Sequence, residues 1–116
     1  MKKITFILLI LSLSLSLSTA FAGTQNGKVS FIKIRTDGTI KIGLDTVWTD
    51  FARCRTKEWW IISDENSVAG KAQLSLLMTA YASGRTVKIG GFPDGGICTR
   101  TTGLGEDIYN VNLSDF

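Results

Sequence analysis

The apolar residues of this chain change their spacing part-way along, and that change limits the fold more than any other sequence feature. Between residues 29 and 44, short apolar runs alternate with polar residues, which is the period of β-strands, and an apolar run follows at residues 59–62. Between residues 66 and 84 the spacing becomes helical, with Asn66 or Ser67 suited to the N-cap and Gly84 to the C-terminal end. The helical face that we expect to cover the core comprises Leu74, Leu77, Met78 and Tyr81.

Five β-strands are expected around this helix, over residues 29–34, 40–44, 59–62, 86–89 and 108–113. Residues 45–57 and the glycine-rich stretch 90–96 are expected to be loops. In the last strand the alternation predicts that Tyr109, Val111 and Leu113 point inward.

Two local signals shape the first half of the expected sheet. The apolar phase flips between Phe31 and Ile32, which indicates a β-bulge, because one extra residue exchanges the two faces of a strand. Asp37 and Gly38 stand between two alternating runs and predict a tight hairpin.

The resulting order, β-β-β-α-β-β, is that of the OB-fold, a five-stranded Greek-key barrel. A bulged first strand fits this fold, because that strand must bend to serve both halves of the barrel. A five-stranded sandwich with an added helix is the alternative. We therefore predict a mainly β protein with one helix, folded as an OB-fold barrel.

The amino terminus has the three parts of a Sec-type signal peptide. A basic start, Met1–Lys3, precedes an apolar, serine-rich stretch, and Ala20 and Ala22 occupy the small-residue positions of a cleavage site before Gly23. The apolar stretch is shorter than the roughly 20 residues of a membrane-spanning helix, so we expect no stable membrane anchor. The prediction is a signal peptide over 1–22, a single domain over 23–116, and a periplasmic or secreted protein.

The charge balance argues against a nucleic-acid partner. The chain has 13 Lys and Arg against 10 Asp and Glu, a formal charge of +3, and Lys2 and Lys3 leave with the signal peptide, so +1 remains. Nucleic-acid binding needs a clear basic excess.

No catalytic or metal-binding constellation is visible either. The chain lacks histidine, which is the commonest base and nitrogen ligand. Glu106 and Asp107, with Asp94 in the preceding loop, lack the spaced ligand set of a calcium site. We expect no enzymatic activity, no cofactor and no metal.

The two cysteines, Cys54 and Cys98, predict one disulfide, since an even pair in a small exported domain reads as a structural bridge. Closing a loop of about 44 residues would stabilise the domain by roughly 4 kcal/mol in the chain-entropy model.

The passage from Leu77 to Ile89, LMTAYASGRTVKI, resembles the helix-Gly-x-x-Val-x-Ile segment of pertussis-like and typhoid-like B subunits of bacterial A–B toxins. It is also similar to small exported bacterial proteins of unassigned activity. In the toxin family the B subunits are OB-folds that bind host glycans and form a pentameric ring around a catalytic partner. The resemblance implies a ring-forming recognition subunit, but no sugar-binding residue of the family can be placed on this chain.

The residues themselves offer one candidate binding surface, an aromatic and arginine cluster suited to an acidic glycan or a carboxylate. Its members are Trp48, Arg53, Arg55 and Trp60. A solvated loop is the alternative for Trp48 and the arginines, and burial under loops is the alternative for Trp59 and Trp60.

The helix has a second face on which small residues surround Leu76 and would let a neighbouring helix approach closely. This expected oligomer interface comprises Ala69, Ala72, Leu76 and Ala80. A solvated face with one tolerated leucine is the alternative.

Two functions follow from these patterns. The first is an exported binding module, ring-forming by resemblance, that recognises a glycan or a protein. The second is a monomeric periplasmic inhibitor or accessory protein that acts through a loop. Solution mass separates the two.

Overall fold

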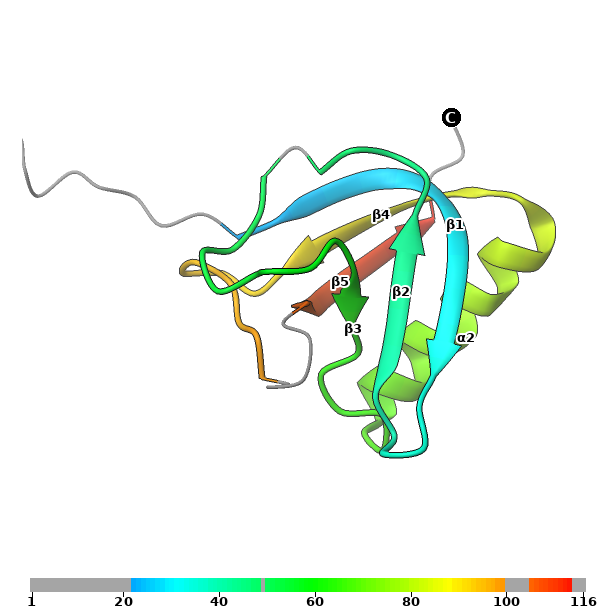
Figure 1. Ribbon diagram of the computed structural model, residues 1–116. Coiled ribbons are helices and arrows are strands. Elements are labelled where there is room, and N and C mark those ends of the chain that lie inside the picture. The colour runs from blue at the N-terminus through cyan, green and yellow to red at the C-terminus, as the bar shows by residue number, and fades with distance from the viewer. Residues whose placement is uncertain (1–21, 49, 100–104, 114–116) are drawn as a thin grey trace, which may run out of the picture.

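A closed five-stranded β-barrel with one helix is the architecture of this protein, which we describe from a computed structural model covering residues 22–48, 50–99 and 105–113 (Figure 1). The elements in chain order are β1 (Thr24–Ile34), β2 (Ile40–Leu44), β3 (Trp60–Ile61), α2 (Val68–Ser83), β4 (Thr86–Gly91) and β5 (Glu106–Leu113). The strands follow one another around the barrel as β1-β2-β3-β5-β4. This confirms the predicted mainly β class, element order and OB-fold barrel.

The long strand β1 serves both halves of the barrel, as its sequence predicts. Thr24–Lys28 pairs with β4, whereas Val29–Ile34 pairs with β2, and both pairings are antiparallel. The register slips between Val29 and Phe31, which leaves Ser30 as the extra residue of a bulge. The bulge therefore lies at Ser30, just before the phase change between Phe31 and Ile32, and it bends β1 from one half of the barrel to the other.

The predicted hairpin between β1 and β2 is also present. Gly38 has a φ of 90°, in the left-handed region that glycine adopts without strain. Its N–H donates to the carbonyl of Arg35 at 3.0 Å, and the Arg35 N–H donates to Thr39 at 2.9 Å. The short strand β3 then pairs antiparallel with β2 and parallel with β5, which closes the barrel.

Helix α2 begins and ends where its capping residues predict. The Ser67 hydroxyl accepts from the Gly70 N–H at 2.9 Å, and Gly84 has the left-handed conformation at the C-terminal end. The helix packs against β1, β4 and β5.

The inner face of α2 differs from the prediction. Gly70, Leu77 and Ala80 are buried, whereas Met78 and Tyr81 are 54% and 53% exposed. Gly70 lies against the backbone of Asp64 in the turn before the helix, whereas Leu77 and Ala80 pack in the core. The buried face therefore centres on Leu77 and leaves both larger side chains at its edge. The expectation that Met78 and Tyr81 cover the core is wrong.

The last strand carries a second bulge that the alternation hides. The register slips where Gly90 pairs with Asn110 and Gly91 pairs with Ile108, so Tyr109 is the extra residue. Ile108 is consequently buried, and Tyr109 is 50% exposed and packs against Phe92. The predicted inward orientation of Tyr109 is wrong, although Val111 and Leu113 are partly buried against the core.

The core fills the barrel with aliphatic side chains around one tryptophan. Its buried members are Val29, Ile40, Ile42, Trp60, Ile62, Leu77, Ala80, Val87, Ile89 and Ile108. No helix within the described residues is long and apolar enough to cross a membrane. The expected signal peptide lies outside the described residues, except for Ala22.

Candidate functional site

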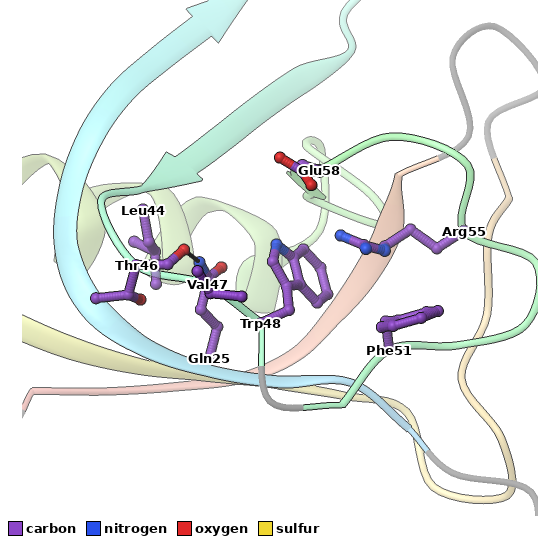
Figure 2. Close-up of a pocket in the computed structure, with 8 residues that line it drawn as sticks. All are labelled: Gln25, Leu44, Thr46, Val47, Trp48, Phe51, Arg55 and Glu58. Atoms are coloured by element: carbon purple, nitrogen blue, oxygen red, sulfur yellow. Dashed lines mark hydrogen bonds between the residues drawn. The ribbon is translucent and has the colours of Figure 1, made fainter.

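A pocket of about 270 Å³ opens where β1, the end of β2 and the following loop meet (Figure 2). Most of its wall comes from the predicted loop between β2 and β3. It is lined by Gln25, Leu44, Thr46, Val47, Trp48, Phe51, Arg55 and Glu58.

The pocket wall is a stack of aromatic and guanidinium groups. Trp48 stacks on Trp60, with ring centroids 4.2 Å apart and an interplanar angle of 12°. The guanidinium carbon of Arg55 lies 4.2 Å from the Trp48 ring centroid and 4.6 Å from that of Phe51. Because Trp60 covers one face of the Trp48 indole, the guanidinium takes the other face, and Figure 2 shows it pointing toward that ring.

Trp60 supports this stack from inside the barrel and does not line the pocket. Its side chain is 0% exposed, and its Nε1 donates to Gln25 Oε1 at 2.9 Å. Gln25 in turn donates from Nε2 to the Thr46 carbonyl at 2.5 Å. The prediction that Trp60 contacts a ligand is wrong, because this strand residue faces the core.

Three donors at the stack are buried and have no hydrogen-bond partner among the described residues. They are Nε and Nη1 of Arg55 and Nε1 of Trp48. A buried donor without a partner costs about 1–3 kcal/mol, and a charged one costs more. The pocket is therefore short of acceptors, which an anionic or hydroxyl-rich ligand would supply.

Arg53 is not part of this pocket. It is exposed in the same loop, two residues before Arg55, and the structure does not bring it to the pocket wall. Of the four predicted binding residues, Trp48 and Arg55 line the pocket.

The predicted disulfide between Cys54 and Cys98 is present, with an S–S distance of 2.07 Å. It joins the pocket loop to the loop between β4 and β5, directly beside Arg55. A turn bond from the Arg55 N–H to the Ala52 carbonyl, at 3.1 Å, holds the same segment. The bridge therefore restrains the residue that carries the unpaired guanidinium donors.

A buried carboxylate that sequence analysis did not place in a site anchors the pocket loop from below. Glu106 is fully buried; its Oε1 accepts from the Ala52 N–H and its Oε2 from the Gly23 N–H, both at 2.7 Å. Burial raises the pKa of Glu106, while these two N–H groups and the charge of Arg55 act in the opposite direction. No sequence signal marks Glu106 as internal, because a charge at the start of a strand ordinarily faces water.

The neighbouring Asp107 is also held by its own chain. Its Oδ2 accepts from the Thr99 hydroxyl at 2.6 Å, and its Oδ1 accepts from the Thr99 N–H at 3.2 Å. The described residues contain no group of three or more carboxylate or cysteine side chains that could hold a metal ion.

The expected oligomer interface is only partly on the surface. Ala69 and Ala72 are exposed and Leu76 is half-buried, but Ala80 is fully buried against the barrel. Ala80 is therefore a core residue, and its assignment to the interface is wrong, because the buried helix face extends past Leu77 to this small side chain.

Larger apolar side chains are exposed on a different side of the helix. Ile34 is 63% exposed at the end of β1, and with Ile32, Met78, Tyr81 and Ala82 it lines one shallow depression. We call these five residues the strand–helix patch.

Comparison of this chain with protein-family models, curated proteins and solved structures finds no match.

Proposed function

We propose that this protein is an exported binding module that recognises an acidic glycan in the pocket formed by Trp48, Phe51 and Arg55. The observation that carries the proposal is the set of buried, unpartnered donors on Arg55 and Trp48 at the pocket wall. An acidic sugar would bring a carboxylate to these donors, and a charge-assisted bond of this kind is about twice as strong as a neutral one.

The rest of the lining favours a sugar over a simple anion. Glu58 lies on the same wall, and its carboxylate can only accept hydrogen bonds. Sugar hydroxyls can donate to it, whereas an inorganic anion without a hydroxyl cannot. Phe51 is exposed and offers an apolar ring to the carbon face of a sugar. An anion, several hydroxyls and one apolar face are together the chemistry of an acidic monosaccharide unit.

A glycan array on the purified protein, followed by titration calorimetry with the best acidic hit, tests this proposal. Arg55→Gln should weaken binding at least tenfold, because it removes the charge that meets the carboxylate. Arg53→Gln is the matched control, since it removes the same charge from the same loop outside the pocket and should leave binding within about twofold. Equal losses in both variants, or no acidic hit on the array, would place the function elsewhere.

The protein is also proposed to self-assemble, as a pentamer by its resemblance to the toxin B subunits. The strand–helix patch is the surface that assembly would bury, because Ile34, Met78 and Tyr81 are each more than half exposed there. A monomer with no glycan ligand would instead support the periplasmic inhibitor or accessory protein acting through the same loop.

A further inference from the structure

The backbone nitrogen of Gly23 is hydrogen-bonded to a buried carboxylate. It lies 2.7 Å from Glu106 Oε2, and both residues are buried next to the first residue of β1. A carboxylate so enclosed requires strong donors, since its charge is costly to remove from water.

This nitrogen is also the atom that cleavage of the expected signal peptide would free. In that hydrolysis water adds to the Ala22 carbonyl carbon and the Ala22–Gly23 bond breaks. Ala22 leaves as a carboxylate, while the Gly23 nitrogen takes up protons and becomes an α-ammonium group. A signal peptidase of the export machinery is the catalyst required.

We propose that the buried carboxylate of Glu106 is a preformed binding site for the new amino terminus. Removal of the signal peptide then creates a buried ion pair between the α-ammonium of Gly23 and Glu106. The inference rests on the cleavage site expected from the sequence and is independent of the ligand proposed above.

The surroundings of Glu106 fit a terminal glycine closely. A Cβ on Gly23 would overlap with Glu106 Oε1 and would come within 2.9 Å of the Trp48 ring. A Cβ on Gly91 would overlap with Oε2 and would lie 3.3 Å from the Gly23 nitrogen. The carboxylate and the nitrogen therefore occupy a space that only glycines at these two positions leave open.

The first residues of the mature chain are fixed on both sides. The Gly91 N–H donates to the Gly23 carbonyl at 2.9 Å, and the Thr24 N–H donates to the Asp50 carbonyl at 3.2 Å. The amino group would therefore be held at Glu106 by the sheet itself, without a separate ordering cost for a free terminus.

The same carboxylate links the amino terminus to the pocket. Its other oxygen accepts from Ala52, whose own carbonyl accepts from the Arg55 N–H. The ion pair would consequently stabilise the loop that carries Phe51 and Arg55. Processing would then complete both the domain and its pocket loop only after export.

The test compares four exported proteins, purified after processing and checked for their first residue by intact mass. Two begin at Gly23, with Glu106 or with the Glu106→Gln substitution. Two carry one alanine inserted between Ala22 and Gly23, again with either residue at 106, so that the ammonium is displaced by one residue.

The first measurement is the α-amino pKa, from an NMR titration of the isotope-labelled Cα of Gly23. In the Gly23-start protein with Glu106 it should exceed the usual value of about 8 by one unit or more, since a carboxylate in contact favours the ammonium. The pKa should return to its usual value in both the Glu106→Gln and the inserted-alanine proteins.

The second measurement is the urea midpoint, read as a double-mutant cycle. The inserted alanine should lower the midpoint when Glu106 is present and change it much less in the Glu106→Gln background. An ordinary α-amino pKa in the Gly23-start protein, or a mature chain that begins elsewhere, would overturn the proposal. If Glu106→Gln fails to fold, the pKa comparison between the two Glu106 proteins still decides. None of these measurements involves a glycan, so they remain decisive even if the protein does not bind the proposed acidic glycan.

Discussion

Trp48 and Trp60 stack with their ring centroids 4.2 Å apart, and this pair connects the barrel core to the candidate pocket. Trp60 is held by a buried hydrogen bond to Gln25, and Trp48 presents its other face to Arg55. A rigid core residue therefore sets the position of a pocket residue that comes from a loop. Sites supported in this way are better preorganised than sites built on loops alone.

Replacing Gln25 should destabilise the domain through Trp60. Gln25→Leu leaves the Trp60 Nε1 donor buried without a partner, which costs about 1–3 kcal/mol. The loss should appear as a lower urea midpoint. Asn26→Ala, at the neighbouring exposed position, is the control and should change the midpoint little. Equal midpoints for the two variants would show that the Trp60–Gln25 bond contributes nothing.

Breaking the disulfide should cost more than any single surface substitution. The Cys54→Ala, Cys98→Ala double variant releases a loop whose ends are 44 residues apart, and the chain-entropy model gives about 4 kcal/mol for such a closure. Urea unfolding of the oxidised protein and of the double variant measures the difference. A change below about 1 kcal/mol would indicate that the pocket loop is already ordered by the Glu106–Ala52 bond.

The strand order and the first bulge could be predicted because their signals are local. The apolar phase flips between Phe31 and Ile32, next to the bulge at Ser30, and the Asp37-Gly38 pair marks its hairpin directly. The second bulge could not be predicted, because Tyr109, Val111 and Leu113 alternate without interruption through the slipped register. Only pairing with β4 reveals that Tyr109 is the extra residue.

The site was predictable where the residue types carry the chemistry, as in Trp48 and Arg55. The residues that hold these two side chains in place were not predictable. Trp60 and Arg53 are as aromatic or as basic as their neighbours, and only the fold sends one into the core and the other to the surface. The burial of Glu106 was the least predictable feature, because it depends on the close approach of Gly23 and Gly91, which are far apart in the chain.

Glu106 should make the stability of the chain depend on pH when a neutral backbone N–H of Gly23, and not an ammonium group, contacts its Oε2. Burial raises its pKa, so the folded state binds the proton more tightly than the unfolded state does. Its contribution to stability is then fully present below the ordinary glutamate pKa of about 4.3 and is lost as the pH rises through the raised value. Urea midpoints of the inserted-alanine protein, measured from pH 4 to pH 8, should therefore fall with pH.

Two comparisons isolate the carboxylate responsible for that slope. Glu106→Gln should flatten it, whereas Glu58→Gln, which removes an exposed carboxylate from the pocket, should retain it. The slope should also be smaller in the Gly23-start protein, because an ammonium beside Glu106 favours its charged form. A slope that persists in Glu106→Gln would assign the pH dependence to another group.

Self-assembly should depend on the strand–helix patch and not on the small-residue face around Leu76. Met78→Glu places a charge on a side chain that is already 54% exposed, so it should dissociate an oligomer while the subunit stays folded. Leu76→Glu is the contrasting variant, on the other side of the same helix, and should leave the oligomer intact. Light scattering gives the mass, and circular dichroism checks the fold of each variant. If only Leu76→Glu dissociates the oligomer, the interface is the one first expected from the sequence, with Ala80 left out. If the wild-type protein is a monomer at high micromolar concentration, neither interface exists.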